Sequence, residues 1–176
     1  LTAREQSVNV RNGVVEGVGE LENAGFGVRV LVNGAWGFAS SAIITAKEVG
    51  RITAEAIDIA KASASYQQHR VYLGPPEVHQ AVYHTPVEID PFTVSIEDKI
   101  ALLLEADRLM RTEASVKVSQ GNLVCLRKHQ TFASTEGSTV EQEIFETGGA
   151  IMALAIANGE IQRRSYPNVF RDQHAE

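Results

Sequence analysis

The sequence predicts an α+β fold, in which a largely antiparallel sheet of hairpins carries two packed amphipathic helices. Three observations predict it: asparagine–glycine pairs recur between apolar runs, two stretches have helical periodicity, and strand-rich blocks stand on both sides of those stretches. The 176 residues are enough to bury a sizeable core. We therefore expect residues 1–176 to form a single domain.

The hairpins are predicted from the turn chemistry. Asparagine–glycine is the strongest short hairpin signal, because both residues tolerate a positive φ. The three pairs are Asn12-Gly13, Asn33-Gly34 and Asn158-Gly159. The first lies within a strand–turn–strand pattern over residues 7–18, and the repeated use of this turn favours antiparallel meanders.

The first helix is predicted to begin at Thr45, where Thr-Ala-Lys-Glu has the form of a capping box. It fades in the small polar run over residues 61–65. The apolar residues that fall on one face at helical spacing are Val49, Ile52, Ala56, Ile59 and Ala60. We expect this face to be buried.

The second helix is predicted to begin at Ser95 and to run to about Arg111. Its predicted buried stripe consists of Ile96, Ile100, Leu103 and Leu104. The carboxylates of Glu97, Asp98 and Glu105 are expected on the solvent-exposed face of this helix. A charged surface is a better interpretation of these residues than a catalytic acid/base pair.

The remaining segments are predicted to be extended. Residues 71–92 contain four of the five prolines, which favours an extended connection without a long helix. A second antiparallel block follows over residues 115–137, 139–157 and 160–166.

Composition narrows the classes of function. The net charge of −6 without a basic block makes direct nucleic-acid binding a poor prediction. The single cysteine, Cys125, allows no internal disulfide and favours a reducing compartment. No signal peptide and no bilayer-length apolar run is found, so we expect a cytoplasmic protein without a membrane partner. The start at Leu1 rather than methionine favours a processed or trimmed piece.

Catalytic patterns are weak in this chain. His79 and His84 are five residues apart, which does not make a two-ligand metal clip, and neither HExxH nor HExxxH occurs. Cys125 and His129 lie roughly 13 Å apart along an extended strand, so a buried structural thiol is the better prediction. No phosphate-binding glycine loop is completed.

Two stretches contain charged, aromatic or hydroxyl side chains that packing and turn formation alone do not require. In residues 28–40, alternation places three valines toward the core and Arg29 on the opposite face, toward a cleft, a partner or solvent. Residues 132–138 combine small hydroxyl residues with a carboxylate and a glycine, which suits either a plain turn or a functional loop. The candidate substrate-cleft or interface residues are Arg29, Trp36, Phe38, Ser134, Glu136 and Gly137. We expect Arg29 to pair with a carboxylate such as Glu136, and Trp36 to serve packing.

These stretches resemble a known family. Residues 10–13 (VRNG) and 25–40 (GFGVRVLVNGAWGFAS) are similar to the N-terminal signature of TldD/PmbA proteins, also called proposed modulators of DNA gyrase. Residues 134–137 (STEG) resemble a small-small-Glu-Gly element of the same domain. Residues 164–168 (RSYPN) and 171–174 (RDQH) resemble the TldD branch.

The resemblance implies a cytoplasmic zinc metallopeptidase that works as a homodimer or as a TldD–PmbA heterodimer. Its metal motif, an HExxxH helix with a later cysteine, belongs to a C-terminal domain, so this chain is expected to supply neither a catalytic residue nor a zinc ligand. An initial strand or helix is expected before Leu1. The N-terminal domain of such proteins helps to wall the cleft for an extended, unfolded peptide.

Two alternatives stay open at the level of sequence. One is a non-catalytic, PmbA-like partner or gyrase-modulating interaction module. The other is a free-standing structural or interaction domain.

Overall fold

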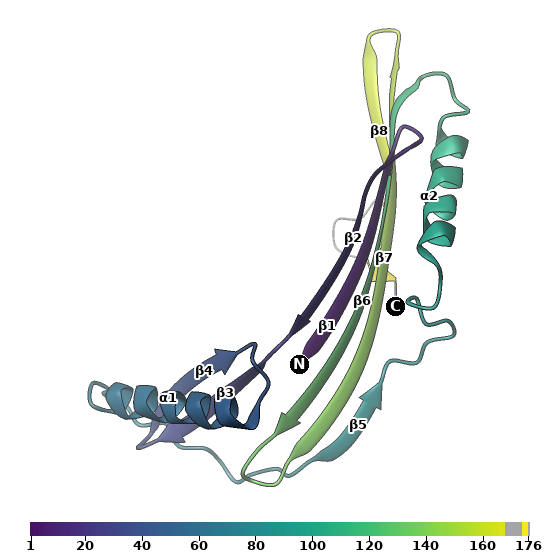
Figure 1. The fold of residues 1–176 in the computed structure, drawn as a ribbon. Coiled ribbons are helices and arrows are strands. Elements are labelled where there is room, and N and C mark those ends of the chain that lie inside the picture. Colours follow the sequence, from purple (N-terminus) through teal and green to yellow (C-terminus); the bar gives the residue numbers. More distant parts are fainter. Residues whose placement is uncertain (168–173, 176) are drawn as a thin grey trace. The chain divides into compact units, whose positions relative to one another are not determined.

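The computed structural model describes residues 1–167 and 174–175. Two compact units are present (Figure 1), and each is described by itself. The first unit contains Leu1–Thr2, Asn23–Tyr83 and His129–Gln142, and the second contains Ala3–Glu22, His84–Lys128 and Glu143–Glu176. The expectation of a single domain over residues 1–176 stays a prediction.

The α+β fold class is confirmed, with two helices and mostly antiparallel strands. The helices are α1 (Ala46–Ala64) and α2 (Ile96–Met110). The strands are β1 (Thr2–Arg11), β2 (Val14–Ala24), β3 (Phe26–Val32), β4 (Ala35–Ser41), β5 (Gln80–His84), β6 (Val116–Ala133), β7 (Thr139–Ala157), β8 (Glu160–Tyr166) and β9 (His174–Ala175).

The described strands form two sheets. The larger has the order β2-β1-β6-β7-β5, with β8 and β9 also pairing with β7. The smaller consists of β3 and β4. The long connection between the helices includes the short strand β5, which joins the large sheet beside β7.

The three asparagine–glycine pairs lie at the β1–β2, β3–β4 and β7–β8 turns. Their asparagines have φ values of 49°, 51° and 52°, and the following glycines 78°, 81° and 78°. Positive φ at both central positions is the geometry that gives a two-residue turn the twist of the flanking strands.

In the first unit, α1 packs on the β3–β4 sheet. Thr45 caps the helix, its Oγ1 accepting a hydrogen bond from the Glu48 N–H at 3.2 Å. The helix buries Ile52, Ala56 and Ala60. The predicted apolar face was too wide, because Val49 and Ile59 at its margins are 41% and 40% exposed. The two-stranded sheet is only broad enough to cover the central row of the helix.

The small residues of β4 explain how closely α1 approaches. Ala35, Gly37 and Ala39 are all buried on the helix side of the strand. A Cβ added at Gly37 would lie 2.0 Å from the Ala56 carbonyl oxygen and 2.7 Å from the Ala60 nitrogen. The glycine therefore allows the helix backbone to lie directly on the strand.

In the second unit, α2 packs on β1 and β6. Val8, Val10 and Leu103 form the core, with Ile100 and Leu104 packed against it. The predicted stripe was incomplete, because α2 also buries Lys99 and Asp107, which are 4% and 1% exposed.

Both buried charges have partners from distant segments. The Lys99 Nζ donates to Gln6 Oε1 at 2.7 Å. The Ser119 hydroxyl donates to Asp107 Oδ1 at 2.6 Å, and the Ser119 amide donates to Asn12 Oδ1 at 2.9 Å. These bonds connect α2 to β1, to β6 and to the first asparagine–glycine turn.

Candidate functional site

The β3–β4 hairpin has two chemically different faces. The antiparallel register pairs Arg29 with Phe38 and Leu31 with Trp36. Phe26, Val28 and Val30 pack toward α1, so the alternation places Arg29 and Leu31 on the other side, as the sequence predicts. We call this other side, made of Arg29, Leu31, Trp36 and Phe38, the outer face.

Arg29 and Trp36 are a stacked pair on the outer face. The Arg29 Cζ lies 4.1 Å from the centroid of the Trp36 ring, which is cation–π geometry. The expected ion pair with Glu136 is wrong for the described residues, where Arg29 forms no ion pair within 4.0 Å. Its partner is the diagonal cross-strand neighbour, a contact that the hairpin register could have predicted.

Phe38 lies over a glycine on the same face. A Cβ added at Gly27 would meet the Phe38 ring at 2.8 Å, so the ring covers the backbone of β3. Even so, Phe38 is 57% exposed, while Trp36 is half-buried. The outer face thus offers an arginine and two aromatic rings, which are residue types enriched in protein–protein interfaces.

The second candidate stretch, Ser134–Gly137, forms the turn between β6 and β7. The Gly137 N–H donates to the Ser134 carbonyl at 3.1 Å, and Gly137 has a φ of 103°. Glu136 is exposed, and no ion pair to it is found among the described residues. Buried Ser138 anchors the turn, its Oγ accepting from the His79 N–H at 3.0 Å. The turn is well built, but these contacts point to no specific ligand.

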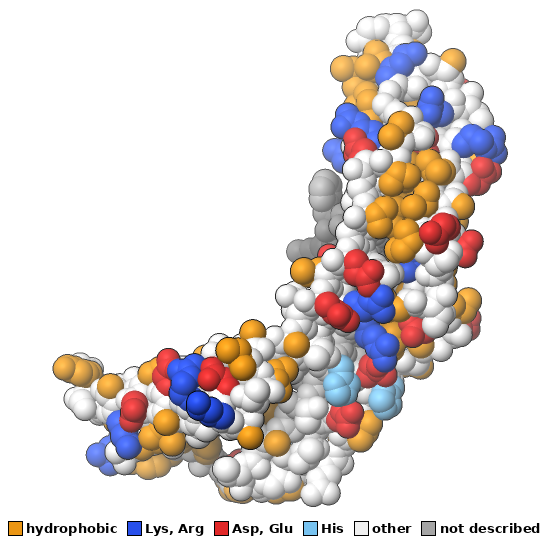
Figure 2. All heavy atoms as spheres, viewed as in Figure 1, with side chains coloured by type: hydrophobic (Ala, Val, Ile, Leu, Met, Phe, Trp, Pro, Cys, Tyr) orange, Lys and Arg blue, Asp and Glu red, His pale blue; other side chains and the backbone are white. Residues whose placement is uncertain are grey.

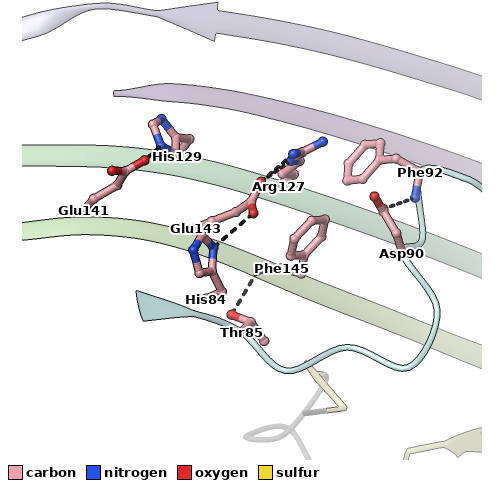
Figure 3. Close-up of polar contacts among 9 residues, drawn as sticks. All are labelled: His84, Thr85, Asp90, Phe92, Arg127, His129, Glu141, Glu143 and Phe145. Carbon is pink, nitrogen blue, oxygen red and sulfur yellow. Dashed lines mark hydrogen bonds and ion pairs between the residues drawn. The ribbon is translucent and has the colours of Figure 1, made fainter. Parts of the chain in front are cut away.

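A polar cluster in the second unit was missed by the sequence reasoning (Figure 3). Glu143 on β7 accepts from Arg127 Nε on β6 at 2.8 Å, and its other oxygen lies 3.2 Å from His84 Nδ1 on β5. The Arg127 Cζ also lies 5.2 Å from the centroid of the Phe145 ring. Hydrogen bonding from Arg127, with a smaller contribution from His84, lowers the pKa of the Glu143 carboxyl. The three strands are neighbours, but only the sheet order reveals the cluster.

Figure 2 shows that acidic and basic side chains are interspersed with hydrophobic ones on the surface. Within the first unit, His129 Nε2 lies 2.8 Å from Glu141 Oε1. Among residues 1–167, no group of three histidine, cysteine or acidic side chains is arranged to hold a metal ion. These residues therefore do not fit a zinc site.

Cys125 is a buried thiol, 2% exposed. Burial raises the pKa of this thiol above its ordinary value. The prediction that Cys125 is a buried thiol is confirmed. Among the described residues, no helix combines the length and the apolarity needed to cross a membrane.

The class of protein is defined first by the fold, a pair of α+β units built on antiparallel hairpins. A family model described as the PmbA/TldA metallopeptidase domain 1 matches residues 2–60. A second, the PmbA/TldA metallopeptidase central domain, matches residues 89–173. The chain belongs to the PmbA/TldD metallopeptidase family, of which it carries the first and central domains.

Individual relatives agree with this membership. A metalloprotease of Methanocaldococcus jannaschii is 27% identical over 158 residues, which cover 89% of this chain and 34% of the relative. The crystal structure of a proposed DNA gyrase modulator from Thermotoga maritima superposes with a TM-score of 0.70 at 17% identity. That of TldE from Thermococcus kodakarensis superposes with a TM-score of 0.65 at 13% identity.

The coverage of these structures is similar. The superpositions take in 93% of this chain but 36% of the Thermotoga protein and 37% of TldE. The chain thus spans about a third of the length of the relatives that it matches. Of the ending that resembles the TldD branch, residues 168 and 171–173 lie outside the described residues.

Proposed function

We propose that this chain is the non-metal-binding part of a TldD-type zinc metallopeptidase and that it shapes the cleft in which an unfolded peptide lies extended. The observation that carries the proposal is the outer face of the β3–β4 hairpin. It presents Arg29, Trp36 and Phe38 together on a sheet whose other face is fixed by α1. A binding surface on a rigid backing needs little ordering when a peptide arrives.

The hairpin offers two complementary kinds of contact. In the described part of the chain β3 and β4 pair only with each other, so each has an edge that can add an extended peptide through backbone hydrogen bonds. The Arg29 guanidinium lies over the Trp36 ring, and a guanidinium carries five N–H donors that a cation–π contact does not use as hydrogen-bond donors. These donors suit peptide carbonyls, which occur in every sequence.

In the proposed peptidase, zinc would be bound by residues that are not part of this chain, because the described side chains do not form a set of metal ligands. The cytoplasmic location and the homodimer or TldD–PmbA heterodimer are further parts of the proposal. Light scattering on this chain tests the dimer contacts, and a clean monomer would count against them.

The outer face is tested by peptide binding to this chain. Anisotropy of a fluorescein-labelled unfolded peptide gives the affinity, and emission of Trp36, the only tryptophan, reports binding at the hairpin. Loss of charged hydrogen bonds in Arg29→Ala should weaken binding about tenfold. The matched control is Lys47→Ala, which removes an exposed positive charge from α1. If the two variants bind the peptide with equal affinity, the proposed role of Arg29 is wrong.

The alternative is a non-catalytic, PmbA-like partner subunit or gyrase-modulating module, and the structurally similar Thermotoga protein is described as a proposed modulator of DNA gyrase. The full-length gene product separates the two. An HExxxH motif following residue 176 supports the peptidase, and a family C-terminal domain without it supports the partner subunit.

A further inference from the structure

The second unit contains a polar groove that the hairpin proposal does not use. It has a volume of about 720 Å³, within the range of roughly 300–1,000 Å³ typical of small-molecule sites. Its lining comes from β1, β2, β6, β7 and β8 and includes Asn9, Gln120, Asn122, Arg163 and Arg164.

The amides of the groove lie on the sheet face that α2 leaves open. Val10 packs in the core beneath α2, and a Cβ at Gly121 would meet Leu103 at 3.2 Å. Alternation along β1 and β6 therefore turns Asn9, Gln120 and Asn122 to the opposite face. Among residues 1–167, the side chains of these three make no hydrogen bond.

Arg163 is the arginine that alternation turns toward the amides of the groove, because it pairs with Leu154, whereas Arg164 pairs with Ala153 on the face of Ile151 and α2. The lining of the groove contains Arg163, Arg164 and a single carboxylate, Glu16. The Arg164 guanidinium is partly used, since it donates to the Arg163 carbonyl at 2.8 Å. Within the described part of the chain, Arg163 forms neither a side-chain hydrogen bond nor an ion pair. A guanidinium and three amides without side-chain partners among the described residues can together bind one carboxylate and the flanking peptide groups.

We infer that this groove binds a carboxylate of a peptide, either its C-terminus or an acidic side chain. Arg163 forms the ion pair, and the amides of Asn9, Gln120 and Asn122 donate to and accept from the adjoining peptide backbone. A phosphate group fits less well, because its second negative charge would face Glu16 without a second free arginine. The inference rests on the proposed function only in taking a peptide as the ligand.

The test measures binding of two probes to this chain. One is a fluorescein-labelled hexapeptide of neutral residues with a free C-terminal carboxylate, and the other is its C-terminal amide. Anisotropy should show the acid binding about tenfold tighter than the amide, since charge-assisted hydrogen bonds are lost. In NMR spectra, the side-chain amide signals of Asn9 and Asn122 should shift with the acid only.

Variants separate the groove from general electrostatics. Arg163→Gln should weaken binding of the acid about tenfold. The matched control is Arg108→Gln, which removes an exposed arginine that pairs with Glu105 on α2. It should change the affinity less than twofold. Inorganic phosphate should displace the peptide no better than acetate at equal ionic strength.

Each opposite result overturns the inference: equal binding of acid and amide, equal effects of the two arginine variants, absent shifts at the groove amides, or preferential displacement by phosphate. The proposed function fails separately. A full-length protein without peptidase activity leaves the groove result standing, and an active peptidase whose groove binds no carboxylate removes this inference alone.

Discussion

The close approach of α1 to β4 gives the sharpest test of the fold. Replacing Gly37 with alanine adds a methyl group whose carbon would lie 2.0 Å from the Ala56 carbonyl oxygen. Ordinary contact begins at 3.4 Å, so the helix must retreat by 3.4 − 2.0 = 1.4 Å. Both opposing atoms at Ala56 and Ala60 are backbone, so no side-chain rotation relieves the clash.

That retreat costs packing along the whole helix. A gap of 0.5–1 Å forfeits roughly a quarter to a half of a dispersion contact, and here the gap would open beside Ile52 and Ala56, both fully buried. Overpacking typically costs about 1–3 kcal/mol. With a backbone clash of this size, we expect Gly37→Ala to lower the free energy of unfolding by about 3 kcal/mol or more. The midpoint temperature should then fall by at least ~12 °C in a unit of this size.

The matched control is Gly50→Ala, because Gly50 lies within α1 and has no atom within 4 Å of an added Cβ. It should stabilise the first unit by roughly 0.5–1 kcal/mol, since alanine is the better helix former. Urea titrations followed by far-UV circular dichroism and Trp36 fluorescence measure both variants. A Gly37→Ala midpoint within error of the wild type would refute the packing described for α1.

Three further predictions concern buried and charged groups, and a fourth concerns the number of domains. Asp107→Ala should lower the free energy of unfolding, measured by urea titration, by about 3 kcal/mol, because the Ser119 hydroxyl loses its acceptor. A decrease no larger than that caused by replacing an exposed glutamate with alanine would contradict this. Hydrogen bonding from Arg51 lowers the pKa of Glu48 to about 2, so its stabilising contribution should be full above pH 4.5 and be lost as the pH falls toward 2. A carboxyl NMR titration with a midpoint near 4.5 would rule that out. Cys125 should react with a thiol reagent only upon unfolding, and fast reaction of the native chain would show it accessible. If residues 1–176 form a single domain, calorimetry should show one transition, and two would favour independent units.

The helices and turns could be predicted because their signals are local. Thr45 and Ser95 each cap a helix through their own side chains, and the bonds reach only three residues along the chain. The asparagine–glycine turns likewise need only two residues with positive φ. Such features are encoded where they occur, so a single sequence is sufficient to place them.

The buried charges could not be predicted, because their partners are distant in sequence. Helical periodicity counts Lys99 as solvent-facing, yet its acceptor on Gln6 lies 93 residues away. The half-buried Glu143 could not be predicted for the same reason, since its partner His84 is 59 residues away on a neighbouring strand. Pattern analysis assigns polar residues to the surface, and only the strand order supplies the hydrogen bonds that permit burial.

Successive side chains of β4 point to opposite faces, so that one face of this seven-residue strand packs against α1 and the other is available for binding. Its inward positions are small because α1 lies directly on them, and a larger residue there would displace the helix. Its outward positions carry Trp36 and Phe38, although Phe38 is 57% exposed and adds little to the core of the first unit. A purely structural hairpin would gain solubility from polar residues at these two positions. The proposed peptide cleft would account for the aromatic pair, because an extended peptide that adds to the hairpin edge would bring side chains onto this face at the same two-residue spacing.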